Sequence, residues 1–170
     1  TNGFELILEK SDLDGLSEGT IAAASDAASQ KMEKAETKED EEKYKDKFVF
    51  TPHRSSMYPF LTESTRRDLR EQLYNSYVMR GDNNNETDNK EIAAQIAKLR
   101  AERAEIMGYK SHAHFVLDNN MLKTPEEVYD LLTKLWDPAV KRAKAEIADM
   151  QAVANAEGQT FEVAAWDWWH

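Results

Sequence analysis

The chain has 170 residues, of which 41% are hydrophobic, and this is enough for one domain with a buried core. Acidic residues number 32 against 22 basic residues, so the formal net charge of −10 would repel a phosphate backbone and an anionic lipid surface. We therefore expect no nucleic-acid partner and no membrane partner. The absence of cysteine excludes disulfides, thiolate zinc sites and cysteine nucleophiles.

The sequence also bears on the compartment. It holds no apolar run of the length that spans a bilayer, and its start, "TNGFELILEK", lacks the basic and then hydrophobic layout of a signal peptide. We expect a cytoplasmic protein. A periplasmic or exported protein stays an alternative, because trimming of the N terminus would have removed its signal.

The first expected element is a helix. Ser17 is placed to cap it, and the alanine-rich composition favours helix from about Glu18 to the mid-thirties. The densely charged residues 34–47 that follow have too little apolar surface to pack. We expect a charged loop or mobile link there.

A short strand comes next. Phe48, Val49 and Phe50 form a β-prone run that Pro52 stops. One strand cannot form a sheet, so its partner is expected in the "SSMYPFLT" stretch, in another copy of the chain or in sequence outside it. The prediction is a short strand or hairpin near residues 47–61.

Two helices are expected in the middle of the chain. The first covers residues 65–80 and ends at Gly81, and the second runs from a capping box of Asp88 and Glu91 to Gly108. The first helix carries an apolar stripe made of Leu69, Leu73 and Tyr77, extended by Arg80. The buried side of the second is expected to consist of Ile92, Ile96, Leu99 and Ile106.

The last part of the chain predicts a short helix capped by Ser111 and then one long helix over about residues 125–157. Thr124, Pro125 and Glu127 give the long helix a strong start, and Gly158 gives it an end. Its apolar residues step by three or four throughout. They are Val128, Leu132, Leu135, Ala139, Ala143, Ile147, Met150 and Ala154. Pro138 lies inside this helix and is expected to kink it.

Together these elements predict a mainly α fold of five or six helices. We expect residues 1–170 to form a single helical segment without internal repeats. The tail "AAWDWWH" is expected to begin a further helix with Asp167 as its cap.

Histidine offers no metal site in the sequence. His112 and His114 are two positions apart on a predicted helix and therefore point to different sides. The zinc-binding pattern H-E-x-x-H, in which two histidines lie one turn apart, does not occur. We expect no metal ligands in this chain.

The other candidate patterns are equally weak. Asp82, Asn84 and Glu86 loosely resemble a calcium loop, but the positions that need glycine and the final glutamate are occupied by other residues, so an ordinary polar turn is expected. Residues 85–87 form a glycosylation sequon of a kind that is common by chance. Tyr74 and Tyr77 could line a cleft, although their helical spacing is more typical of core residues. We therefore assign no catalytic residue, and the substrate-binding residues stay unknown.

Several stretches, taken in order, resemble the thimet oligopeptidase family of zinc metallopeptidases, and specifically its bacterial peptidyl-dipeptidase branch, Dcp. The most specific are "LRAERAEIMGY", "KTPEEVYDLL", "LWDPA" and "WDWW", and the resemblance covers most of the chain. Two departures concern loops: the charged run at 34–47 is longer than the usual link, and "TPHRSS" has its proline earlier.

This resemblance implies a larger enzyme of two helical lobes around a deep channel, with one zinc ion held by H-E-x-x-H and a distant glutamate. It implies short peptides as substrates and a C-terminal dipeptide as the product. The family's zinc ligands and main substrate-binding residues lie downstream of "WDWW". The chain therefore resembles an internal, non-catalytic fragment of the channel wall that binds no cofactor itself and is inactive alone.

Two hypotheses follow. In the first, the chain is this channel-wall fragment, and its uncovered apolar surface lets it self-associate. In the second, it is a self-contained acidic helical interaction module that binds a partner through its aromatic C-terminal tail.

Overall fold

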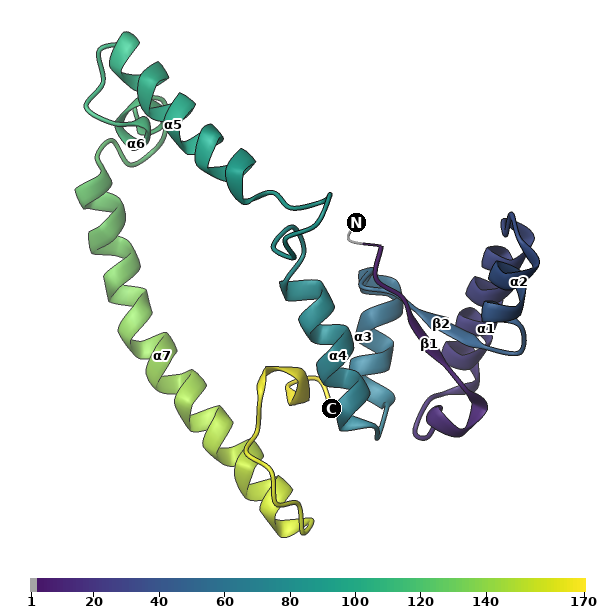
Figure 1. The fold of residues 1–170 in the computed structure, drawn as a ribbon. Coiled ribbons are helices and arrows are strands. Elements are labelled where there is room, and N and C mark those ends of the chain that lie inside the picture. The colour runs from purple at the N-terminus through teal and green to yellow at the C-terminus, as the bar shows by residue number, and fades with distance from the viewer. Residues whose placement is uncertain (1–2) are drawn as a thin grey trace. The chain divides into compact units, whose positions relative to one another are not determined.

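The computed structural model describes residues 3–170 and divides them into two compact units, each described here by itself (Figure 1). Unit 1 contains the described residues up to Asp88 and the tail, Ala164–His170, and unit 2 contains Asn89–Val163. Thr1 and Asn2, which belong to the stretch tested above for a signal layout, lie outside the described residues. Within residues 3–170, none of the helices combines the length and the apolarity needed to cross a membrane.

Unit 1 contains a two-stranded antiparallel sheet. Strand β1 (Leu6–Leu8) pairs with β2 (Phe48–Phe50), and Ile7 lies opposite Val49. The predicted strand is thus confirmed, but none of its three expected partners is correct. The "SSMYPFLT" stretch lies in helix α3 (Arg54–Glu63) because its largest apolar residues recur at helical spacing.

The charged run at 34–47 contains a short helix, α2 (Lys38–Tyr44), which follows α1 (Glu18–Glu33). The Ser17 hydroxyl accepts a hydrogen bond from the backbone N–H of Thr20 at 3.3 Å, which confirms Ser17 as the cap of α1. Tyr44 anchors α2, because its ring is buried and its hydroxyl donates to the Glu5 carboxylate at 2.7 Å. A 3-10 turn, η1 (Lys10–Asp12), joins β1 to the segment before α1.

The core of unit 1 lies between the sheet, α1, α3 and α4 (Arg67–Val78). The rings of Phe50 and Phe60 contact each other with their centroids 4.6 Å apart. Leu69 and Leu73 on α4 are buried here, as the sequence predicts, whereas Arg80 lies beyond the end of α4 and is exposed. The other large buried members of this core are Leu6, Leu8, Met57 and Leu61.

Unit 2 consists of α5 (Lys90–Ile106), α6 (His112–Leu117) and α7 (Pro125–Ala156). Helix α7 starts as predicted, with the Thr124 hydroxyl and the Glu127 carboxylate each accepting the other residue's backbone N–H. The helix continues through Pro138, and the kink stays a prediction. Gly108 and Gly158 follow α5 and α7 with positive φ, as expected of helix ends.

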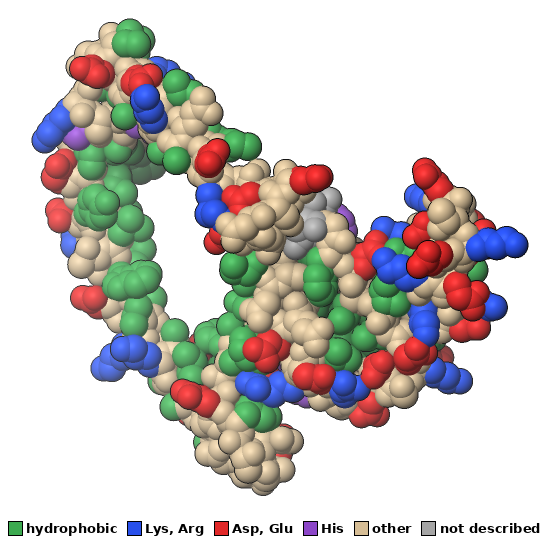
Figure 2. All heavy atoms as spheres, viewed as in Figure 1, with side chains coloured by type: hydrophobic (Ala, Val, Ile, Leu, Met, Phe, Trp, Pro, Cys, Tyr) green, Lys and Arg blue, Asp and Glu red, His purple; other side chains and the backbone are tan. Residues whose placement is uncertain are grey.

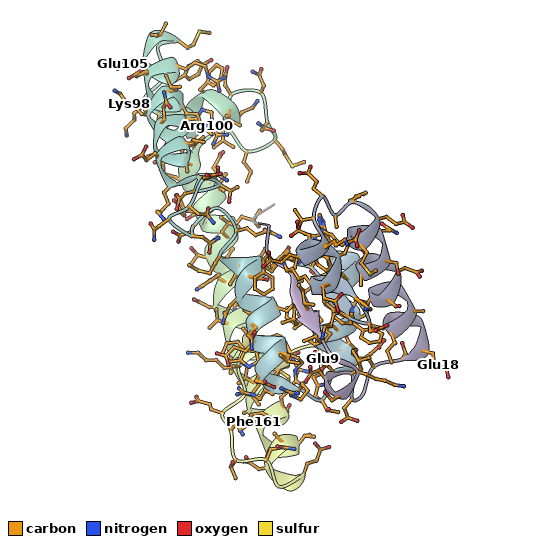
Figure 3. The ribbon with its side chains drawn as sticks, turned by 45° about the vertical axis from the view of Figure 1, so that its right-hand side comes forward. Glu9, Glu18, Lys98, Arg100, Glu105 and Phe161 are labelled. Carbon is orange, nitrogen blue, oxygen red and sulfur yellow. The ribbon has the colours of Figure 1, made fainter. Side chains whose placement is uncertain are left out.

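The predicted start and the predicted buried side of α5 are wrong. The capping position is Asn89, whose side chain makes no capping bond, and the Asp88 carboxylate accepts the Asn84 N–H. The side expected to be buried is largely exposed: Ile92, Ile96, Leu99 and Ile106 expose 54%, 44%, 53% and 84%. Lys98, Arg100 and Glu105, marked in Figure 3, are exposed as well. The apolar period of α5 therefore indicates a face that no other described residue of unit 2 covers.

Gly15 lies in the segment between η1 and α1 and adopts a φ of +84°. A Cβ atom at Gly15 would collide with the carbonyl oxygen of Glu63 and would lie 3.0 Å from the backbone nitrogen of Thr65. We expect Gly15→Ala to lower the free energy of unfolding by about 2–4 kcal/mol, because a left-handed conformation and a backbone clash combine. Urea denaturation measures this change.

Gly19 is the matched control, because it lies inside α1 and a Cβ atom there would meet open space. Gly19→Ala should raise the free energy of unfolding by about 0.5–1 kcal/mol through helix propensity. Equal effects of the two substitutions would contradict the close approach at Gly15.

Candidate functional site

The two histidines considered as metal ligands lie on α6 and have separate surroundings. His114 Nδ1 lies 2.7 Å from the Ser111 hydroxyl, and the His112 ring stacks loosely on Phe115 with centroids 6.4 Å apart. The structure does not bring them together with acidic groups. Across residues 3–170 we find no group of three His, Asp or Glu side chains that could hold a metal ion. These residues therefore do not fit a zinc ion.

The calcium-like stretch forms a turn closed by its own side chains and backbone. Asn83 donates from its amide to the Met79 carbonyl at 2.7 Å, and the Asn84 N–H donates to the Asp88 carboxylate at 2.7 Å. Asn84 adopts a positive φ of 50°, a conformation that asparagine tolerates better than most residues. These bonds are typical of a polar turn, as the sequence predicts.

The larger hollow described in unit 1 offers no catalytic chemistry. It has a volume of about 440 Å³ and lies between α1, β2 and the start of α3. Its lining consists of small, apolar and hydroxyl-bearing residues, such as Ala23, Ala27, Thr51 and Ser55. Neither a carboxylate nor a histidine lines it, so it contains no acid–base pair.

Tyr74 and Tyr77, the two aromatic candidates on α4, are half-buried against the core of unit 1. The core assignment is thus correct, but each ring also has a second contact. The guanidinium of Arg80 lies 3.7 Å from the Tyr77 ring centre, and hydrogen bonds from Arg54 and then Arg80 hold the pKa of Tyr77 below its usual value. Tyr74 faces the tail.

The tail (residues 164–170) is bound to α4 through one carboxylate, that of Asp167. Asp167 lies in the 3-10 turn η2 (Ala165–Asp167), and only 7% of its side chain is exposed. One oxygen accepts from Nη2 of Arg70 at 2.9 Å and the other from Nη2 of Arg67 at 3.0 Å, while Nε of Arg67 lies 3.2 Å from both. This fork geometry is the strong, charge-assisted arrangement.

Arg70 is itself almost fully buried, with 2% of its side chain exposed. Its second terminal nitrogen donates to the Ser64 carbonyl at 2.6 Å, which fixes the guanidinium between the end of α3 and the tail. Burial raises the pKa of Asp167, but the Ala164 N–H at 2.9 Å and then the arginine pair (Arg67 and Arg70) outweigh it, so this pKa lies below its usual value.

A cluster of aromatic rings also joins the tail to α3 and α4. Trp166 and Trp169 both contact Tyr74, with centroids 6.2 Å and 6.1 Å apart, and Trp169 also contacts Tyr58 at 5.7 Å. The Arg67 guanidinium lies 5.3 Å from the Trp166 ring. Trp168 and Trp169 nevertheless keep 45% and 40% of their surface exposed.

The structure thus differs from the prediction that Asp167 begins a further helix. The carboxylate bonds back to Ala164 and across to α4 instead. Sequence reasoning missed Arg67 and Arg70, although one signal was available. Two arginines one turn apart at the start of a helix oppose the helix dipole, so a nearby anion was to be expected.

Unit 2 contributes a different kind of surface, a row of uncovered apolar side chains on α7 (Figure 2). Between Tyr129 and Ala139 every residue of α7 is exposed. Trp136 exposes 68% of its surface, Leu135 60% and Leu132 52%. Single exposed apolar residues are ordinary, but a contiguous row is typical of a surface that contacts another part of a protein.

Comparison with known proteins gives a consistent result. Residues 60–170 match the model of Peptidase family M3. Oligopeptidase A of Salmonella typhimurium is 32% identical over 167 residues, which are 96% of this chain and 23% of that protein. The dipeptidyl carboxypeptidase of Escherichia coli is 27% identical over 98% of this chain and 23% of its own length. A protein of Arabidopsis thaliana named probable cytosolic oligopeptidase A is 30% identical over 98% of this chain and 23% of its own length. The chain thus spans about a quarter of the length of these relatives.

The Asp167 geometry predicts a pH dependence. Because the folded pKa lies below the usual pKa of an aspartate, the stability that Asp167 contributes is present above that usual pKa and is lost as the pH falls through the folded pKa. At pH 7, Asp167→Asn should lower the free energy of unfolding by about 3 kcal/mol, since it leaves two arginines without their anion. The difference from the wild-type chain should stay constant down to about pH 5 and shrink below about pH 4.

Urea denaturation at several pH values measures this difference. Asp130→Asn, which removes an exposed carboxylate on α7, is the control and should have little effect at any pH. An Asp167→Asn chain as stable as the wild type at pH 7 would show that the ion pair does not hold the tail.

Proposed function

The chain belongs to peptidase family M3, and from that premise we propose that it forms part of the channel wall of a longer zinc-dependent peptidase and supplies no catalytic residue. The observation that carries this proposal is the match of residues 60–170 to the family in a chain whose described residues contain no metal-holding group. The zinc ion of the family would then be held by residues outside this chain.

The exposed apolar residues of unit 2 support a structural role. A helix that is apolar along one side gains most of its stability from the packing of that side. On α7, Leu132, Leu135 and Trp136 are spaced for such packing, yet all three are more than half exposed. We propose that other parts of the longer polypeptide cover them.

The substrates proposed for the longer protein are short peptides, and the finer proposal is the release of dipeptides from the C-terminal end. The name of the Escherichia coli relative, dipeptidyl carboxypeptidase, supports the finer proposal, whereas the names of the Salmonella and Arabidopsis relatives indicate oligopeptidases. For the compartment we propose the cytoplasm, which agrees with the name of the Arabidopsis relative.

An activity assay tests this proposal. The longer protein, loaded with zinc, should release dipeptides from a short peptide with a free C terminus, and the 170-residue chain with zinc should release none. Mass spectrometry of the products measures both results. A peptide with an amidated C terminus separates the two activities, because internal cleavage of it by the longer protein would favour an oligopeptidase. Zinc-dependent cleavage by the 170-residue chain would contradict its non-catalytic role.

A second candidate function is a self-contained helical interaction module, which the exposure of Trp168 and Trp169 favours. The two candidate functions assign contact with other molecules or segments to different surfaces of the chain. An interaction module would bind its partner through the tail, whereas a channel-wall segment exposes its unpartnered surface on α5 and α7.

Self-association distinguishes these surfaces. We expect the 170-residue chain to self-associate through α7, and Leu132→Glu combined with Trp136→Glu to reduce the association at least about tenfold, because two charges would have to be buried. Light scattering over a concentration series measures the change. Lys134→Glu, on the same helix and with the same change of two charge units, is the matched control. If both variants associate as the wild-type chain does, α7 is not the contacting surface.

A further inference from the structure

We propose that α3 and α4 form a recognition site for an aromatic and acidic peptide segment, which the chain's own tail occupies and which accepts the same segment from solution once the tail is released. The tail site is defined by Tyr58, Arg67, Arg70 and Tyr74. Its binding chemistry is independent of any peptidase activity.

The charged part of the tail site is also held by a contact at the end of α3. Arg70 is 2% exposed with the tail bound, and its bond of 2.6 Å to the Ser64 carbonyl is a second contact that orients the guanidinium and does not involve the tail. Arg67 presents its Nε and Nη2 groups along the same carboxylate. Two guanidinium groups select a carboxylate, because each of its two oxygens can accept a hydrogen bond, whereas a neutral amide has one accepting oxygen and an NH2 donor.

The aromatic part of the tail site selects the residues on either side of the aspartate in the bound segment. Tyr74 contacts the tryptophan before Asp167 and the second tryptophan after it, and Tyr58 contacts the latter ring as well. Arg67 serves both parts, because its guanidinium pairs with Asp167 and also lies 5.3 Å from the Trp166 ring. The ligand that fits is therefore a segment with tryptophan on both sides of an aspartate.

The contacts described above that hold the tail run mainly through side chains. Apart from the backbone turn of η2 and a contact of 3.2 Å between His170 Nδ1 and the Thr62 carbonyl, the contacts described above join side chains of the tail to side chains of α3 and α4. Along the chain, the 75 residues of unit 2, Asn89–Val163, separate the tail from the rest of unit 1. The tail thus acts as a tethered ligand whose occupancy depends on its effective concentration.

The experiment releases the tail and offers the segment from solution. In the full chain, Asp167→Lys places a third cation beside the arginine pair, which should expel the tail and leave the site open. A labelled peptide of sequence AAWDWWH is then titrated into this variant and its fluorescence anisotropy is measured. The comparison peptide is AAWNWWH. The control chain carries Asp137→Lys, which makes the same charge change at an exposed position of α7 and leaves the tail bound.

We expect the aspartate peptide to bind the Asp167→Lys chain at least about tenfold more tightly than the asparagine peptide, and the control chain to bind it at least about tenfold more weakly. No binding to the Asp167→Lys chain, equal binding of the two peptides, or equal binding to the two chains would each overturn the proposal. If circular dichroism shows that Asp167→Lys has lost helix, Asp167→Asn carries the same comparisons.

Discussion

A buried ion pair joins the two segments of unit 1, the residues up to Asp88 and the tail. Asp167 and Arg70 are 97 residues apart in sequence, and both are almost completely removed from water. Burial of charge is costly, and it is offset here because the carboxylate accepts from Arg67, Arg70 and Ala164 while Arg70 also donates to Ser64. The position of the tail and the packing of its tryptophans depend on this pair, and so does the attachment of the tail to the rest of unit 1.

Unit 2 differs from unit 1 in how well the apolar faces of its helices are covered. Helix α7 begins at its predicted cap, and both α5 and α7 end just before a glycine as predicted, yet their apolar faces remain largely exposed among the described residues. Helix boundaries are set by capping and by glycine, which act within a few residues, whereas burial needs a partner surface. These exposed faces agree with the proposal that other parts of a longer polypeptide cover them, because the relatives are about four times as long as this chain.

The difference between local signals and long-range contacts explains which parts of the structure the sequence could predict. The caps at Ser17 and Thr124 and the strand at Phe48–Phe50 follow from neighbouring residues, and the structure confirms all three. The pairing of β2 with β1 and the pairing of Asp167 with Arg67 and Arg70 join residues about 40 and 100 positions apart, and a single sequence contains no local signal for such contacts. The long-range contacts of the candidate site were therefore beyond sequence reasoning, although the two arginines at the start of α4 indicated that an anion was needed.

The segment that follows α7 is attached at two points that are close together in the sequence. Gln151 on α7 donates to the Phe161 carbonyl at 3.0 Å and accepts the Val163 N–H at 2.8 Å, and Phe161 is marked in Figure 3. Only three residues separate Val163 from Asp167, which is held by α4. The residues between them also make contacts of their own, because the Ala164 N–H donates to Asp167 and the Trp166 ring contacts Tyr74, so a deletion here would remove one of these contacts. A change of length in the polar turn between α4 and α5 would remove none of these contacts.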